Sequence, residues 1–210
     1  MKKITSFIFA LALLLSVFGS AYAQEVTSDV DYNSELLSTL GIISKQDLQT
    51  PEKPVSRREF VLYAARAMGI DEYQNTDKRY YIDVPVDDFA AGAINSLTDM
   101  GFLSVNEDKC FRPDATVTLQ EACKILTCAI GYGDYANVAG GFPTGYMNAA
   151  KEASITDGVS GTMDLYTVSR LIVNTLEAPL FEIDTMSAVK QPIGKVKQTL
   201  FFLYTMIFIL

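Results

Sequence analysis

Histidine and tryptophan are absent from this 210-residue sequence, and cysteine occurs only three times. Without histidine, no serine or cysteine can form the histidine pair that activates a nucleophile in many hydrolases. The cysteines also lack the spacing of a zinc site. The adjacent acids Asp87 and Asp88 precede an expected helix, where negative charge is favourable for the helix dipole. We therefore expect a protein that is not an enzyme and that carries no cofactor and no metal.

Basic residues are also few. Lysine and arginine total 17 against 25 aspartate and glutamate residues, which gives a formal net charge of −8 at pH 7. Such a surface repels phosphate backbones, so we expect no nucleic-acid partner. Any other anionic polymer would be repelled as well, unless basic side chains gather at one place.

The N-terminus has the three parts of a secretory signal peptide. Lys2 and Lys3 precede an apolar stretch over residues 4–18, and Ala21 and Ala23 place small residues at the −3 and −1 positions. A membrane anchor is the competing interpretation, but the stretch is short for a span of about 20 residues. We predict a signal peptide over residues 1–23, cleavage between Ala23 and Gln24, and a secreted protein. In such a protein, an odd number of cysteines leaves at least one unpaired within the monomer.

Three ungapped segments of the remaining chain share one pattern. Each begins with a residue suited to cap a helix: Ser56, Thr118 and Asp164. In the first two segments, Glu59 and Glu121 follow three positions later and complete a capping box. Apolar residues then recur at i, i+3, i+4, i+7 and i+8, interrupted in the third segment by Thr175 alone, and this is the buried stripe of an amphipathic helix. The segments predict three equivalent helices.

A second helix is expected before each of these, over residues 34–40, 89–100 and 146–153. The first two end at Gly41 and Gly101, each followed by apolar residues that can fold back onto the helix. The predicted fold is therefore all-α, with three helix-loop-helix repeats spanning about 32–70, 80–133 and 142–180 in a domain over residues 24–180. Since one unit cannot bury its stripe alone, we expect the three to close on one another.

If the three repeats close on one another, the exposure of equivalent residues can be predicted. Equivalent stripe residues should be buried and mutually close: Phe60, Ala64, Leu126, Ile130, Leu171 and Leu176. The equivalent positions off the stripe, Arg66, Cys128 and Asn174, should be more exposed, and Cys128 would then be a surface thiol.

The motifs of these repeats resemble the S-layer homology family. The second copy carries most of them, as Tyr81-Ile82-Asp83-Val84, Gly101-Phe102-Leu103, Phe111-Arg112-Pro113-Asp114 and Thr118-Leu119-Gln120-Glu121. The first copy has the best helix start, Ser56-Arg57-Arg58-Glu59. The resemblance implies a pseudo-threefold helical prism that binds secondary cell-wall polysaccharide and so anchors a protein in the cell wall or at the cell surface.

The resemblance also implies a site. In the family, the arginine of the helix start contacts an acidic, ketal-pyruvylated sugar, and this residue carries over to Arg57. We expect the polysaccharide-binding residues to be Ser56, Arg57, Glu59 and Asp83. Local helix capping explains Ser56 and Glu59 equally well without a ligand, and it is the role expected of Thr118, Glu121 and Asp164.

Two features leave alternatives open. Leu119 and Leu165 stand where Arg57 stands in the first copy, so two grooves look degenerate and could belong to a scaffold for protein interaction. The aromatic residues in and beside the linker 131–145 either stack on sugar rings or close the core: Tyr132, Tyr135, Phe142 and Tyr146.

The last part of the chain, residues 181–210, has a different character. After about Thr185 it contains three lysines and no acids, and it ends in an apolar run over residues 200–210. The run is too short to span a bilayer comfortably. Three interpretations remain: membrane contact of this tail, a strand or helix packed on the domain, or a truncated or frame-shifted reading frame. In the last case the chain would be an anchor fragment of a longer S-layer protein or surface enzyme.

Overall fold

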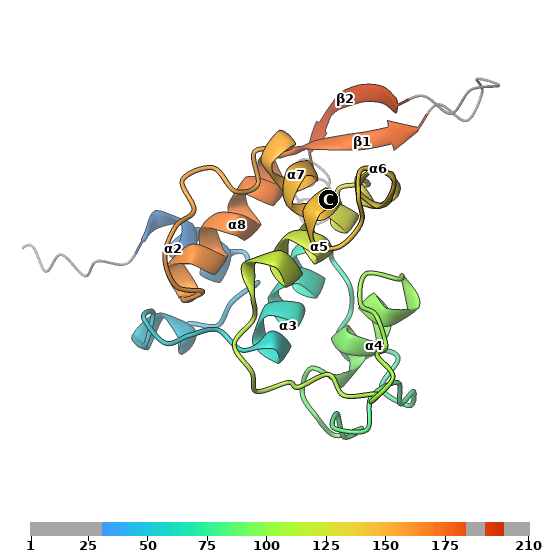
Figure 1. Ribbon diagram of the computed structural model, residues 1–210. Helices are drawn as coiled ribbons and strands as arrows, with labels where there is room; N and C mark the ends of the chain where they lie inside the picture. The colour runs from blue at the N-terminus through green and yellow to red at the C-terminus, as the bar shows by residue number, and fades with distance from the viewer. Residues whose placement is uncertain (1–30, 184–191, 200–210) are drawn as a thin grey trace, which may run out of the picture. The chain divides into compact units, whose positions relative to one another are not determined.

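The computed structural model describes residues 31–183 and 192–199, and these are mostly helical, as the all-α prediction requires (Figure 1). The predicted signal peptide and cleavage site, and the apolar run of residues 200–210, lie outside the described residues. Within the described part, no helix is both long and apolar enough to cross a membrane. The elements are α2 (Tyr32–Thr39), the 3-10 turn η1 (Asp47–Gln49), α3 (Arg57–Ala67), α4 (Ala91–Asp99), α5 (Leu119–Ala129), α6 (Gly133–Val138), α7 (Thr144–Glu152), α8 (Leu165–Glu177), β1 (Pro179–Ile183) and β2 (Pro192–Thr199).

The starts of α3, α5 and α8 follow from their capping residues. The Ser56 hydroxyl accepts from the Glu59 N–H at 3.3 Å, while the Glu59 carboxylate accepts from the Ser56 N–H at 2.8 Å. Thr118 and Glu121 form the same reciprocal pair at the start of α5. Asp164 caps α8 through the Thr167 N–H at 2.9 Å. Each bond satisfies a backbone donor that the first helical turn leaves without an intrahelical partner.

The helix that precedes each of these ends in a left-handed residue. Gly41 and Gly101 take φ values of 74° and 78° after α2 and α4. Glycine has no Cβ penalty there. The third copy lacks this glycine, and Ser154 adopts the same conformation after α7, with φ of 62°. The three helices α2, α4 and α7 each begin within two residues and end within one residue of the predicted spans.

Helices α3, α5 and α8 lie together, and each of the three helix pairs is in contact (Figure 1). All six predicted stripe residues are at most 2% exposed. Arg66, Cys128 and Asn174 are half-buried, hence more exposed than the stripe. The prediction that Cys128 is a surface thiol was wrong. Cys128 is half-buried, because its sulfur lies beneath the backbone of Gly133.

Short extended segments before the capped helices join the units. The Val55 N–H donates to the Met163 carbonyl at 2.8 Å, and the Val117 N–H donates to the Val55 carbonyl at 3.0 Å. The first unit is thereby hydrogen-bonded to both of the others. In addition α2 packs on α8, where the buried hydroxyls of Ser34 and Ser169 are 3.0 Å apart.

Two elements depart from the predicted architecture. Helix α6 lies inside the stretch 131–145 that the sequence assigned to a linker. Strands β1 and β2 pair antiparallel, so the described chain is not helical throughout. At the junction with α5, the Phe181 N–H donates to the Ile130 carbonyl at 2.8 Å, and the Phe181 ring lies 4.5 Å from that of Tyr132. The tail thus begins as a strand against the domain.

Candidate functional site: a groove between the first two units

A cavity of about 280 Å³ opens between the start of α3 and the loops and helix of the second unit. We call it the Arg57 groove. Its walls combine aromatic rings with a few polar side chains, and they include Arg57, Tyr81, Ser104, Phe111, Glu121, Lys124 and Phe142. Apolar walls with a few convergent polar groups are typical of sites for small molecules.

Arg57 is the first residue of α3, and its side chain spans the floor of this groove. Its Nε donates to the Phe111 carbonyl at 2.7 Å, and its guanidinium lies over the Phe111 ring, 4.9 Å from the centroid. A terminal nitrogen forms an ion pair with Glu121. Burial lowers the pKa of Arg57, while nearby Tyr81 and Asp83 act in the opposite direction. Arginine nevertheless stays charged at any physiological pH.

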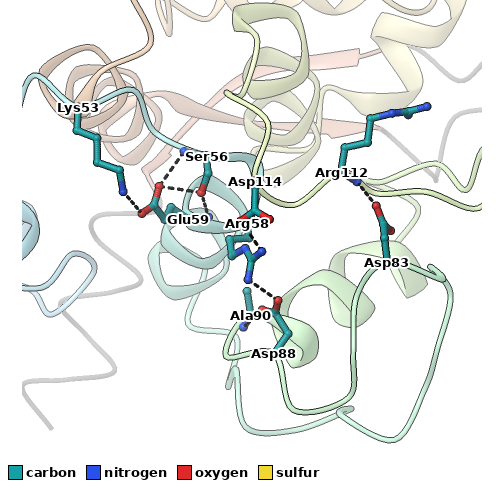
Figure 2. A network of polar contacts seen from close by, with 9 residues as sticks. All are labelled: Lys53, Ser56, Arg58, Glu59, Asp83, Asp88, Ala90, Arg112 and Asp114. Atoms are coloured by element: carbon teal, nitrogen blue, oxygen red, sulfur yellow. Dashed lines mark hydrogen bonds and ion pairs between the residues drawn. The ribbon is translucent and has the colours of Figure 1, made fainter.

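Glu121 therefore has two partners. One carboxylate oxygen accepts from the Thr118 N–H at 3.0 Å and completes the capping box of α5, and the other meets Arg57. The sequence identified Glu121 as a helix cap only. The same capping glutamate in the first unit, Glu59, accepts instead from Lys53 at 3.1 Å (Figure 2).

Asp83 acts behind the groove wall and does not line the cavity. Its two carboxylate oxygens accept from the backbone N–H groups of Phe111 and Arg112, each at 2.7 Å. Figure 2 shows the second of these bonds. Arg112 is held at a φ of 59°, a left-handed conformation that non-glycine residues adopt rarely. Asp83 thus fixes the turn that presents the Phe111 ring and carbonyl to Arg57.

Ser56 and Glu59 lie outside the Arg57 groove. Glu59 lines a separate cavity of about 30 Å³, together with Asp47, Tyr63 and Leu165. Hydrogen bonds from the Ser56 backbone, the Ser56 hydroxyl and Lys53 lower the pKa of Glu59, although burial acts to raise it. The structure therefore separates the four residues expected to bind polysaccharide, and only Arg57 reaches the groove.

The two cavities occupy equivalent places beside successive capped helices. Leu165 at the start of α8 takes the position of Arg57, and Tyr63 takes the position of Ile125 in the Arg57 groove. The larger tyrosine side chain fills space that the isoleucine leaves open. The small cavity thus lacks both the arginine and the volume of the Arg57 groove.

Arg58, the neighbour of Arg57, turns to a different network. Its guanidinium forms ion pairs with Asp88 at 2.6 Å and Asp114 at 2.5 Å (Figure 2). The Asp88 side chain is only 2% exposed and also accepts from the Ala90 N–H at 2.9 Å. This network ties the first unit to the second beside the groove. No sequence pattern predicts this network, since it depends on which way two adjacent arginines point.

The linker aromatics divide between the core and the groove. Tyr132 and Tyr146 are buried, so they close the core, and Tyr135 packs edge-on against Tyr132. Phe142 lines the groove and is 54% exposed, which leaves its ring open to a ligand. Lys124 stands above that ring, and sequence reasoning missed it because it lies outside every motif.

A segment that supplies half of the residues lining this groove matches a known protein family. Residues 83–123 match the family model described as the S-layer homology domain. They run from Asp83 through α4 and the Phe111 loop to the first turn of α5. The resemblance to this family is confirmed for these residues.

Three curated relatives are similar over most of the chain. The "Middle cell wall protein" of Brevibacillus brevis and the "Surface layer protein" of Brevibacillus choshinensis are each 26% identical, over 202 and 197 residues. The "Cell surface protein" of Thermoanaerobacter kivui is 20% identical over 210 residues. The matches cover 87%, 87% and 92% of this chain, but only 19%, 17% and 27% of the relatives. The similarity places this chain among secreted proteins of the cell wall and cell surface.

Proposed function

We propose that the chain binds secondary cell-wall polysaccharide through the Arg57 groove and so anchors the protein at the cell surface, without catalysis. The observation that supports this most directly is the groove itself, a cavity with aromatic walls and a conformationally fixed arginine in its floor. Its volume is near the lower end of small-molecule sites, about 300–1,000 Å³. In this proposal Arg57 contacts the ligand, while Asp83, Ser56 and Glu59 hold the segments that carry the groove walls.

The proposal includes export by the predicted signal peptide and a pseudo-threefold arrangement of the three units. Support for the arrangement comes from the hydrogen bonds of Val55 to both other units and from the mutual contacts of α3, α5 and α8. Under this arrangement the first and second units form the Arg57 groove, and the third and first form the small cavity.

A degenerate scaffold for protein interaction is the second candidate. It is favoured by Leu119 and Leu165 at the arginine positions and by the filled cavity beside Leu165. An anchor fragment of a longer surface protein is compatible with either function, since the chain spans less than a third of each relative.

Sedimentation with wall sacculi tests the proposal. Residues 24–210 should sediment with sacculi that retain their polysaccharide and stay in the supernatant with sacculi stripped by hydrofluoric acid. Arg57→Gln should reduce the bound fraction, whereas Arg79→Gln, at an exposed arginine outside the groove, should not. Equal sedimentation with stripped sacculi would contradict polysaccharide binding. Unchanged retention of the Arg57 variant would favour the scaffold.

A further inference from the structure

The two cations of the Arg57 groove differ in how their charge is balanced. The Arg57 guanidinium is paired with Glu121 and also bonded to the Phe111 carbonyl. Lys124, on α5, donates from Nζ to the Ser104 hydroxyl at 2.7 Å. Within residues 31–183 and 192–199, no carboxylate forms an ion pair with Lys124. The net positive charge of the groove therefore resides on Lys124.

This position is costly for the unliganded protein. Lys124 is half-buried, and burial lowers the pKa of its ammonium group, with only the nearby Cys128 thiol acting in the opposite direction. An ammonium has three donors, and the neutral Ser104 hydroxyl accepts one of them. A desolvated cation without a counter-charge gains most when an anion arrives, because the anion restores the interaction lost with water.

The small cavity offers an internal comparison. The residue equivalent to Lys124 in the first unit is Leu62, which is buried, and the residue equivalent to Arg57 there is Leu165. The cavity between those units thus has leucine at both cation positions, and the lysine that lines it, Lys53, is paired with Glu59. It has about 30 Å³ of space, against about 280 Å³ in the Arg57 groove. Both cations and ligand-sized space occur together in one place.

We propose that Lys124 is the specificity-determining residue of the groove and that it receives the acidic group of the bound sugar, a carboxylate or a phosphate. The inference rests on the proposed polysaccharide binding. The Phe142 ring, 5.9 Å from Nζ and largely exposed, contacts the sugar ring beside that group. Arg57, already paired, contacts neutral oxygens of the sugar and maintains the Phe111 wall.

A direct test uses soluble acidic sugars, so it does not depend on the wall. The lysines are reductively methylated with ¹³C, which keeps their charge, and the Lys124 signal is assigned by its loss in Lys124→Gln. Titration with glucuronate and with glucose 6-phosphate should shift this signal for at least one of them, while glucose should not. The signal of Lys45, an exposed lysine outside the groove, should stay unchanged throughout. A Lys124 signal that neither acidic sugar shifts at saturating concentration overturns the inference.

A second test returns to wall sacculi. Lys124→Gln should bind about 10- to 100-fold more weakly than the wild type, the loss expected for a hydrogen bond to a charged group. Lys45→Gln should bind like the wild type. Equal binding of Lys124→Gln and the wild type overturns the inference while the proposed function stands. Wild-type protein that does not sediment overturns the proposed function, and the titration then decides the role of Lys124 by itself.

The source of the acidic group is distinguished by chemical treatment of the sacculi. Carbodiimide activation followed by borohydride converts carboxylates to alcohols and leaves phosphodiesters intact. If the ligand group is a carboxylate, this treatment should abolish the difference between wild type and Lys124→Gln. If it is a phosphate, the difference should persist. Circular dichroism of each variant verifies that the helices are retained.

Discussion

The carboxylate of Glu121 holds the first turn of α5 and the guanidinium of Arg57 at the same time. One side chain therefore joins the cap of a helix in the second unit to the floor of the groove. Both partners are largely shielded, with 31% and 21% of their side chains exposed. A substitution at Glu121 should therefore lower the stability of the fold and also alter the position of Arg57 in the groove.

Glu121→Gln tests this relationship. The variant should lose about 1–2 kcal/mol of the free energy of unfolding, since it weakens the cap and leaves a half-buried cation without its counter-charge. Urea denaturation measures the loss. Glu59→Gln is the matched control, because it weakens an equivalent capping box whose basic partner among the described residues is the exposed Lys53. Equal losses in the two variants would mean that the Arg57 pair contributes nothing.

Asp83→Ala should destabilise the fold. The substitution removes a charged acceptor from two backbone N–H groups at 2.7 Å. Hydrogen bonds to charged groups contribute about 1.5–3 kcal/mol each, and water that bonds to the freed N–H groups in the variant recovers part of this. We expect a net loss of about 2 kcal/mol in urea denaturation. Asp87→Ala, at an exposed acid four residues further on, should cost little. A fully stable Asp83 variant that fails only in wall binding would assign Asp83 to the ligand instead.

Leu126→Ala probes the shared core of the three capped helices. Leu126 is 2% exposed, and truncation of a buried leucine costs about 2–5 kcal/mol. Val138→Ala, on the surface of α6 at 91% exposed, should cost less than about 0.5 kcal/mol. Thermal or urea unfolding measures both. A loss of under 1 kcal/mol at Leu126 would contradict close packing of these helices.

The thiols should differ in reactivity. Burial raises the pKa of Cys123 to about 12, so almost no thiolate is present at pH 8 and the folded protein also shields the sulfur. Labelling with a disulfide reagent such as DTNB should modify Cys123 only after denaturation. In Cys123→Ser, the native labelling curve should be unchanged and the denatured protein should show one thiol fewer. Rapid native labelling of Cys123 would contradict its burial.

Acid should weaken a contact on the outer side of α4. Hydrogen bonds from Lys78, Tyr80 and Asn75 lower the pKa of Asp99 from 3.8 to about 2. A carboxylate with a depressed folded-state pKa stabilises the fold above its unfolded pKa and loses this contribution as pH falls through the folded value. The stability difference between wild type and Asp99→Asn should be constant above about pH 4 or 5 and shrink toward pH 2. A difference that does not change over this range would refute the assignment.

The helices were predictable because their signals are local. Ser56 with Glu59 and Thr118 with Glu121 mark helix starts by spacing alone, and Gly41 and Gly101 mark ends. Helix α6 was missed because it has only six residues and its glycine-rich surroundings favour a linker. The β1–β2 pair was not predicted, because it depends on contacts between residues far apart in sequence, such as that of Phe181 with Ile130.

The site was predictable in part. Arg57 was found through the resemblance, and it is the one expected binding residue that lines the groove. Asp83 supports the wall, and the pairing of Arg57 with Glu121 joins residues 64 apart in sequence. Lys124 has no motif at all. Its role depends on the fact that no carboxylate within residues 31–183 and 192–199 forms an ion pair with it, which only the three-dimensional arrangement reveals.

The hydroxyls of Ser34 and Ser169 meet across 135 positions of the chain, where α2 of the first unit packs on α8 of the third. In an open array each added repeat finds a free face on its predecessor, so such proteins can lengthen or shorten during evolution. In the proposed closed arrangement, the face that a fourth repeat would need is covered by the first repeat. Such closure limits the copy number within one ring of repeats, and diversification then proceeds by altering the junctions one at a time. At the junction that forms the small cavity, leucine occupies the positions equivalent to Arg57 and Lys124. The junction that forms the Arg57 groove keeps both cations, and this difference between junctions is the pattern that such a constraint produces.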